Sequence, residues 1–476
     1  MGKFSTYRYL ELKDDTSAPH INVRSRILKQ PRRFKKVFIL LLILALCATY
    51  LLGMFAGQSQ WLDGIAKSLG YESEHHYAVI IDAGSSGSRV LAYKFRVPFT
   101  VFGQGNLDLV EEYFEQSKPG LSSFADNPEQ GADTIVQLIK KAEFLIPAEK
   151  RKVTPLIVRA TAGLRLLPED KAQGLLDQVY KAISKLGFDV ASNGVAIMEG
   201  SDEGIFIWYT LNLLHNLMGG QTMAALDLGG GSTQITYQLD ESDKDSYPAG
   251  DQYIVPAGDN ITLYTHSYLK LGLLAARYGI FQLEAGDNSN TTEFVSVCLE
   301  PILTKEPWTY ANKQYYVSGA RRSEGMKREA AMARCYEVVK RYVKRTLDWE
   351  PKQAPKGAVA AMSYFYDVAA DAGLIDVMKG GTVSVSKYRA AALRACSDSN
   401  VEQPWACADL VYVLTLLRDL YRIQDDEPVS VSCYSRIVLR LQRGAAVGLR
   451  RPRVRAYAAA GPLPDPGRRA GLGELL

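Results

Sequence analysis

The sequence predicts an α/β protein in which two related lobes face each other across a catalytic cleft, preceded by one N-terminal transmembrane helix. The main observation is a repeat. From Tyr77 the chain reads YAVIID, AGSSGS and RVLAYKF, which is typical of a strand, a glycine-rich turn and a returning strand. From Met223 the same arrangement recurs as MAALD, LGGGS and TQITY. Apolar residues at helical spacing follow each copy, so two α/β units of common design are expected.

Charge is distributed unevenly along the 476 residues. The net charge is +4, but residues 1–36 carry ten Lys or Arg against three acids, and residues 434–476 carry nine Arg against two. Each end therefore has a charge of +7, and the stretch between them has −10. Because affinity for nucleic-acid backbones comes from clustered Lys and Arg, this acidic body argues against a nucleic-acid groove. An anionic substrate would need a metal ion.

Twenty residues without a charge run from Val37 to Ala56, VFILLLILALCATYLLGMFA. At a rise of about 1.5 Å per residue they match a hydrocarbon core of about 30 Å, which predicts a transmembrane helix. The alternatives are a buried core helix and a signal peptide, whose apolar run is usually about 7–15 residues. Lys and Arg crowd the N-terminal flank, so residues 1–36 are expected in the cytosol and residues 57–76 as a stem on the other side. This is the topology of a single-pass type II membrane protein.

The body beyond the stem is expected in an oxidising lumen, where cysteines form disulfides. Its five cysteines include no CxxC pair and the histidines form no HExxH motif, so a structural zinc site is not expected. Sequons at Asn260 (NIT) and Asn290 (NTT) agree with a glycosylated lumenal body. Cleavage in the stem would release this body by secretion.

The first lobe is expected over residues 77–199 and a helix-rich second lobe over residues 200–432. At about Cys433 the composition changes abruptly, because residues 434–476 contain nine Arg and no Lys. The segment 433–476 is either a basic disordered tail or out-of-frame translation of GC-rich coding sequence. The suddenness of the change favours the second interpretation.

The two glycine-rich turns are the candidates for phosphate binding. Consecutive backbone N–H groups in such a turn form an anion-binding concavity, and residues 84–88 and 229–233 both fit. One such turn alone is more often a plain β-turn, but two matched copies, each preceded by an aspartate, are specific. Asp82 and Asp227 are placed to hold a hydrated Mg²⁺ or Ca²⁺ against phosphate oxygens, or simply to cap their turns. No GxxxxGK[ST] motif follows a strand, which excludes a P-loop enzyme.

Glu203, in MEGSDEGIFIW, is the candidate catalytic base. It follows Asp202 at a predicted helix start, and like charges beside a metal site would tune its pKa. A glutamate at a helix start is otherwise a surface charge favoured by the helix dipole, so spacing alone does not establish the role.

Four blocks resemble the apyrase conserved regions of the ecto-nucleoside triphosphate diphosphohydrolase family: DAGSSGSR, RATAGLRLL, GSDEGIFIW and LDLGGGSTQI, in that order. The family has two lobes of the actin and ribonuclease H type and hydrolyses its substrate by a single displacement with water. The resemblance implies Glu203 as the base, with Ser232 and Gln234 orienting the water. It implies that Asp82 and Asp227 hold Ca²⁺ or Mg²⁺ through its waters, and that Tyr366 stacks on the nucleobase. It assigns phosphate contacts to Ser85, Ser86, Arg89, Thr161, Ala162 and Gly230.

The resemblance also implies a substrate class and a disulfide pairing. One span and few cysteines are typical of the family's lumenal branch, in the Golgi or endoplasmic reticulum, whose members prefer GDP, UDP and IDP and support glycosylation. The pairing it implies is Cys298 with Cys335 and Cys396 with Cys407. The family's fifth region, a tryptophan-containing SWALGA-like segment, is replaced by the Arg-rich tail. The alternative function is therefore a membrane-anchored nucleotide-binding protein with impaired catalysis, and the preferred nucleobase, the metal and the oligomeric state stay open.

Overall fold

The computed structural model of the chain describes residues 32–56, 68–70, 74–97, 108–215, 217–218, 220–257, 259–286, 290–323, 326–351, 354–397 and 402–432. The chain divides into two compact units, Met1–Trp61 and Leu62–Leu476.

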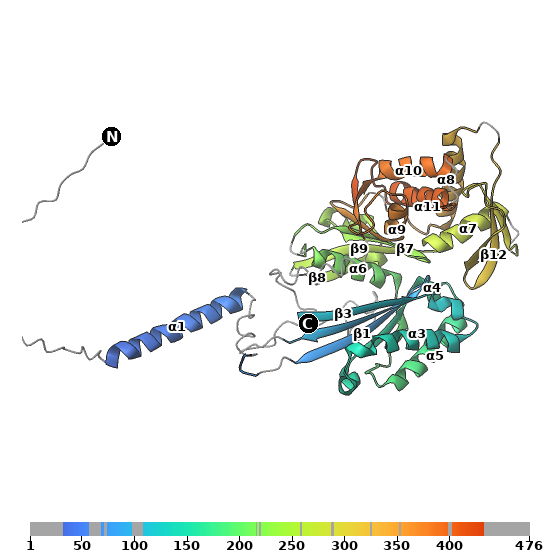
Figure 1. Cartoon of the computed structure of the whole chain (residues 1–476). Coiled ribbons are helices and arrows are strands. Elements are labelled where there is room, and N and C mark those ends of the chain that lie inside the picture. The colour runs from blue at the N-terminus through green and yellow to red at the C-terminus, as the bar shows by residue number, and fades with distance from the viewer. Residues whose placement is uncertain are drawn as a thin grey trace, which may run out of the picture. The chain divides into compact units, whose positions relative to one another are not determined.

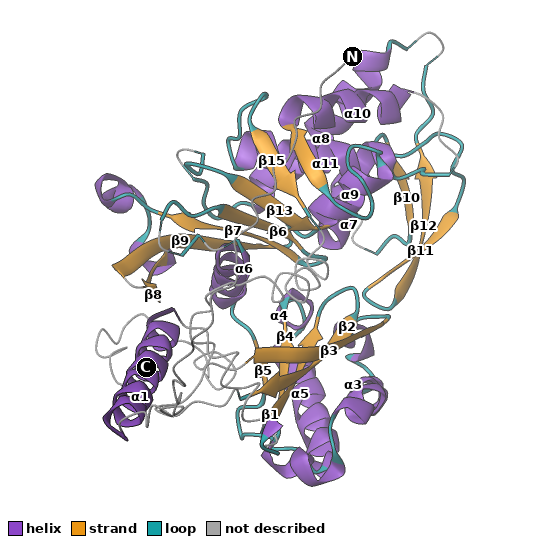
Figure 2. Cartoon of the chain, turned by 60° about the vertical axis from the view of Figure 1, so that its left-hand side comes forward, coloured by secondary structure: helices purple, strands orange, loops and turns teal. Residues whose placement is uncertain are grey.

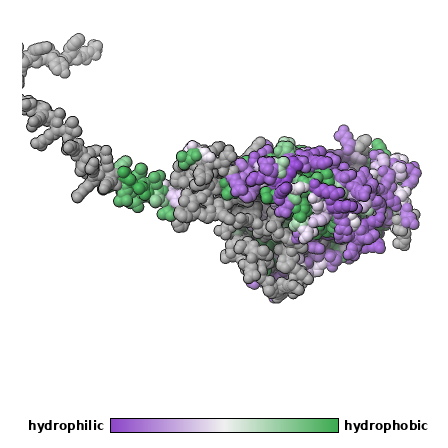
Figure 3. All heavy atoms as spheres, turned by 90° about the horizontal axis from the view of Figure 1, so that it is seen from below, coloured by the Kyte–Doolittle hydropathy of each residue, from purple (hydrophilic) through white to green (hydrophobic). Residues whose placement is uncertain are grey.

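The first unit contains one helix, α1 (Arg32–Ala56), within the residues that the structure describes (Figure 1). Its described side chains, residues 37–51, form an apolar segment that is green in Figure 3. Across all described residues, no helix combines the length and the apolarity needed to cross a bilayer. The predicted span over residues 37–56 is therefore not confirmed and stays a prediction. Residues 1–36, expected in the cytosol, and residues 57–76, expected as a stem, lie mostly outside the described residues.

The second unit begins with a five-stranded sheet in the order β3-β2-β1-β4-β5. The first three strands are antiparallel neighbours, whereas β4 and β5 run parallel to β1. Val79 and Ile81 of β1 are fully buried, because alternate residues of this strand point to the same covered face. Helices α3 and α5 cover that face (Figure 2). The bounds are β1 His75–Ala83, β2 Ser88–Arg96, β3 Asp108–Ser117, α3 Pro128–Ala142, β4 Leu156–Ala160, α4 Ala162–Arg165, α5 Glu169–Ile183 and β5 Val195–Ile197.

A seven-stranded sheet in the order β14-β15-β13-β6-β7-β9-β8 follows. Helix α6 packs on β6, β7 and β9, and the largest core cluster of the unit lies among the other helices and this sheet. The strands are β6 Ala224–Leu228, β7 Ser232–Gln238, β8 Gln252–Ala257, β9 Asp259–Leu269, β13 Val359–Ser363, β14 Gly381–Ser384 and β15 Pro428–Val431. The helices are α6 Gly200–Leu214, α7 Leu273–Ala285, α8 Arg328–Thr346, α9 Tyr364–Asp371, α10 Val385–Ser397 and α11 Ala406–Thr415.

The two sheets share one plan, which confirms the predicted α/β class. In the first sheet β1 pairs antiparallel with β2, β2 antiparallel with β3, and β1 parallel with β4. In the second sheet β6, β7, β9 and β13 repeat these pairings in the same order. Asp82 and Asp227 each stand one residue before the end of the first strand, so they occupy equivalent places in the repeat.

The smaller elements complete the second unit. A three-stranded sheet contains β10 Glu293–Ser296, β11 Glu306–Tyr310 and β12 Lys313–Gly319. Short 3-10 turns are Leu121–Phe124, Glu143–Leu145, Ala148–Val153, Ser184–Leu186, Glu241–Ser246 and Ala249–Asp251, and a π-helical turn spans Leu416–Leu420.

Both predicted disulfides are present, Cys298 with Cys335 and Cys396 with Cys407. Of the two sequon asparagines, Asn290 is exposed, whereas Asn260 lies in β9 with its side chain outside the described residues. The anomalous tail, residues 433–476, also lies outside the described residues, so both interpretations of it stand.

Candidate active site

Three glycine-containing turns meet at the ends of the two sheets. A Cβ added at Gly230 would lie 2.5 Å from Ser85 Oγ, and one added at Gly163 would lie 2.8 Å from Ser85 Cα. A Cβ added at Gly231 would lie 3.0 Å from Ala162 Cβ. The turns after β1, β4 and β6 therefore touch. At Gly163 a side chain would meet the Ser85 backbone, and at Gly230 it would displace the Ser85 hydroxyl.

Each aspartate of the repeat has one short polar contact. Arg89 Nη1 donates to Asp82 Oδ2 over 2.9 Å, and the two residues stand directly opposite each other in the β1–β2 hairpin. Ser363 Oγ donates to Asp227 Oδ1 over 2.5 Å. Desolvation raises the pKa of both carboxyls, although 37% of the Asp82 side chain stays open to solvent. The charge of Asp82 raises the pKa of Asp227 further, so the two carboxylates lie in each other's field.

Glu203, in the first turn of α6, is held by two donors on one oxygen. Arg165 Nη2 donates to Glu203 Oε2 over 2.6 Å, and Gln234 Nε2 donates to the same oxygen over 3.0 Å. Gln234 Nε2 also lies 2.7 Å from Ser232 Oγ and 3.1 Å from Ser267 Oγ. The structure thus brings together the three residues predicted to activate the water.

The Glu203 carboxyl has a strongly raised pKa, of about 8. Burial is the main cause, and Asp227 and Asp82 raise the pKa further, whereas Arg165 lowers it. Only 17% of the Glu203 side chain is exposed, so desolvation is a reasonable dominant cause. A carboxyl poised near neutral pH is what general-base catalysis requires.

The carboxylates fit a hydrated divalent cation. Three acidic groups share one region, and a cation between Asp82 and Asp227 would relieve the repulsion that raises the pKa values of Asp227 and Glu203. No cluster of three or more His, Cys, Asp or Glu side chains suited to a metal occurs in the described parts of the chain.

The remaining predicted residues are placed differently. Ser85, Ser86, Thr161 and Ala162 lie in the turns that meet, beside Gly230. Tyr366, the predicted nucleobase contact, is only 8% exposed and belongs to the core cluster, and its hydroxyl donates to the Val377 carbonyl. In this conformation its ring has little surface for stacking.

Sequence reasoning missed three polar residues of this site. Arg165 comes from the RATAGLRLL block, where its position inside a recognised motif was an available signal. Ser267 gave no local signal, because it reaches Gln234 only through the β7–β9 register. Ser363 has φ 58° and ψ −127°, a region that non-glycine residues rarely adopt, and this strained backbone places its hydroxyl on Asp227.

A repeated α/β plan that brings glycine-rich turns together beside buried carboxylates defines an enzyme that acts on phosphate groups. Such turns bind anions through backbone N–H groups, and the buried glutamate supplies a base. The chain belongs to the GDA1/CD39 (nucleoside phosphatase) family, which it matches over residues 68–437.

Curated relatives cover most of the chain. It is 35% identical to the human protein named nucleoside diphosphate phosphatase ENTPD5, over 87% of this chain and 95% of the relative. It is 35% identical to nucleoside-diphosphatase uda-1 of Caenorhabditis elegans (74% of this chain, 77% of the relative). It is 37% identical to human ectonucleoside triphosphate diphosphohydrolase 6, over 76% of this chain and 75% of the relative. A solved nucleoside triphosphate hydrolase from Neospora caninum superimposes with a TM-score of 0.55 at 13% identity, over 83% of this chain and 97% of that one, which shows a shared fold.

Proposed function

We propose that this chain hydrolyses nucleoside diphosphates of the GDP, UDP and IDP class to monophosphate and phosphate. The names of the relatives support nucleoside diphosphates as substrates, and the choice of GDP, UDP and IDP rests on the resemblance to the family's lumenal branch. The observation that carries the proposal is the buried, raised-pKa Glu203 beside the two glycine-rich turns and their aspartates. The alternative of a catalytically impaired nucleotide-binding protein has no support among these relatives.

The reaction is a single displacement by water. Arg165 and Gln234 both bind Glu203 Oε2, so Oε1 is the oxygen left to take the proton of the attacking water. Gln234 Oε1 is buried without a hydrogen-bond partner among the described residues, so it is free to accept a hydrogen bond from the second O–H group of the attacking water. The water oxygen forms a bond to the terminal phosphorus. The bridging P–O bond breaks, and its electron pair leaves with the nucleoside monophosphate.

The turns hold the phosphates in this proposal. The carbonyls of residues 229, 230 and 231 accept hydrogen bonds from residues 273, 275 and 270, and the Gly229 N–H donates to the Ser232 carbonyl. The N–H groups of Gly230 and Gly231 are therefore the ones proposed to bind an anion. Asp82 and Asp227 would hold Mg²⁺ or Ca²⁺, which when bound neutralises charge on the phosphate oxygens. The phosphate contacts proposed are Ser85, Ser86, Arg89, Thr161, Ala162 and Gly230.

The location and the wider architecture are part of the same proposal. The two sheets correspond to two actin- and ribonuclease H-like lobes with the catalytic cleft between them, and Tyr366 contacts the nucleobase after a local rearrangement. The N-terminal apolar run anchors the chain as a type II protein of the Golgi or endoplasmic reticulum, with cleavage in the stem as the route to secretion. Two disulfides support an oxidising lumen.

The test is phosphate release by the purified full-length chain in detergent. GDP, UDP and IDP are compared with the matching triphosphates, with Mg²⁺ or Ca²⁺ and after chelation. Release from diphosphates that depends on the metal and is lost in Glu203→Gln supports the proposal. Nucleotide binding without phosphate release would favour the impaired protein instead.

A further inference from the structure

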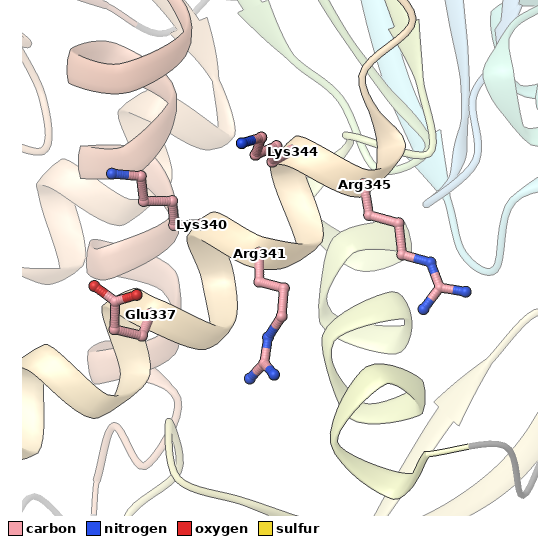
Figure 4. A pocket seen from close by; sticks show the side chains of 5 residues that line it. All are labelled: Glu337, Lys340, Arg341, Lys344 and Arg345. Atoms are coloured by element: carbon pink, nitrogen blue, oxygen red, sulfur yellow. The ribbon is translucent and has the colours of Figure 1, made fainter.

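Helix α8 presents four cations on its exposed surface, Lys340, Arg341, Lys344 and Arg345, here called the basic ridge. Its opposite face is buried and includes Cys335, which is bonded to Cys298. In Figure 4 the two lysines project from one flank of the helix and the two arginines from the other. The i, i+4 spacing therefore gives two parallel rows of positive charge.

These four cations make few close contacts: Arg341 lies in the field of the Glu284 carboxylate, and Lys340 Nζ lies 5.7 Å from the centre of the Tyr336 ring. Among the described residues, no ion pair within 4.0 Å involves any of them, whereas neighbouring arginines are paired, Arg418 with Asp419 and Arg422 with Glu350. Like charges four residues apart destabilise a helix on their own. The buried face of α8 and the disulfide hold the ridge in place against this repulsion.

The ridge stands out against the charge of the body. Residues 37–433 together carry −10, yet the ridge concentrates four positive charges within six residues. It lines an open hollow of about 410 Å³ together with Glu337, and Lys340 also lines an adjoining hollow of about 710 Å³. An open, extended basic surface suits a linear polyanion better than a small anion, which would need a buried polar cradle.

Three features indicate which polyanion. Within the described residues, none of the large exposed apolar side chains lies on α8, so the ridge offers nothing to insert into a bilayer. It also offers no exposed aromatic ring on which bases could stack. The disulfide that fixes α8 belongs to an oxidising compartment, which argues against nucleic acid as the partner. We propose that the basic ridge docks a linear sulfated polysaccharide.

The test is binding of the full-length chain to immobilised heparin as a function of NaCl concentration. The ridge variant carries Gln at all four positions. A matched control carries Gln at four exposed lysines that are distant from α8 in the sequence. It changes the net charge by the same amount as the ridge variant, and its positions are Lys140, Lys152, Lys181 and Lys185. The plot of log K against log salt has a negative slope. By analogy with counterion release from other polyanions, the slope should be less steep by roughly three in the ridge variant than in the wild type.

The control should bind as the wild type does, and both variants should keep nucleoside diphosphatase activity. The basic termini contribute equally to all three proteins, so the comparison isolates the ridge. Equal binding by the ridge variant and its control would overturn the proposal, as would release from heparin by DNA as effectively as by free heparin. If the fourfold variant does not fold, Lys340→Gln with Lys344→Gln and Arg341→Gln with Arg345→Gln should each give about half of the effect.

Discussion

Arg165→Met is expected to shift the pH dependence of hydrolysis rather than simply reduce activity. Arg165 Nη2 lies 2.6 Å from Glu203 Oε2, and the two side chains are 14% and 17% exposed. Arg165 is the cation that lowers the pKa of Glu203, which is nonetheless about 8. Removing the guanidinium therefore raises this pKa further. Because Glu203 accepts a proton only when it is ionised, the variant needs a higher pH for the same rate.

The magnitude follows from the ionised fraction. Below the pKa, each additional unit reduces the ionised form about tenfold, so the rate at pH 7 should fall about tenfold per unit and recover as the pH rises. The loss of stability should be smaller than the roughly 3–5 kcal/mol of a broken buried ion pair, because Glu203 can take up a proton when it loses its partner. A bound cation acts on both proteins, so they are compared at the same saturating metal concentration.

The assay is kcat and kcat/KM for a nucleoside diphosphate between pH 5.5 and about 9, a window chosen around the Glu203 pKa. Arg165→Lys is the conservative control, since it keeps the charge but cannot donate to Glu203 and Ser267 from two nitrogens of a planar fork. The acid limb of its pH–rate profile, where the rate falls as the pH falls, should lie between those of the wild type and Arg165→Met. If the acid limb of Arg165→Met coincides with that of the wild type, Arg165 does not act through Glu203 and the reasoning fails.

Glu203→Gln should lower kcat by about 10²–10⁴-fold while nucleotide binding persists by calorimetry, and retention of more than about a tenth of the rate would contradict the base role. In EDTA, with the metal removed, the pKa of Glu203 in the folded protein exceeds its value in the unfolded chain. The contribution of Glu203 to the stability of the fold is therefore complete below about pH 4.5 and is lost as the pH rises through about 8. Glu203→Gln should raise the Tm relative to wild type at pH 8 but not at pH 4.5. Asp227→Asn should reduce the rate and weaken the response to titrated metal together, and an unchanged metal titration would exclude it as a metal anchor. Gly230→Ala should impair hydrolysis because its Cβ would lie 2.5 Å from Ser85 Oγ, whereas the control Gly174→Ala meets nothing within 4 Å and should keep full activity.

The parts of the site that the sequence predicted are local. A strand, an aspartate, a glycine-rich turn and a returning strand occupy about twenty consecutive residues, and their periodicity and turn chemistry are visible without the fold. The repeat extends this to the second sheet, which is why Asp82 and Asp227 could be matched before any contact was known. Glu203 was identified by the GSDEGIFIW block, which resembles the family, because its position at a helix start was not specific by itself.

The residues that were missed act across long stretches of chain. Arg165 reaches Glu203 over 38 residues, and Ser363 reaches Asp227 over 136. Neither contact has a periodic signal, because it depends on how strands from different segments align in the sheets. Burial is similarly non-local: the aromatic cluster around Tyr366 indicated either core packing or a nucleobase contact, and only the packing of α9 shows the ring to be 8% exposed.

The repeat also explains why the base is found in only one half of the site. Opposite Asp82 the hairpin places Arg89, whose guanidinium compensates the carboxylate, whereas opposite Asp227 the equivalent hairpin places Gln234. The neutral amide leaves the charge of Asp227 free to raise the pKa of Glu203 while it binds Glu203 Oε2 directly. An arginine at position 234 would instead supply a second cation beside Glu203 and lower its pKa. The same backbone plan therefore serves two purposes: the first hairpin pairs its aspartate with a cation, and the second places a neutral amide on a glutamate whose pKa is raised mainly by burial.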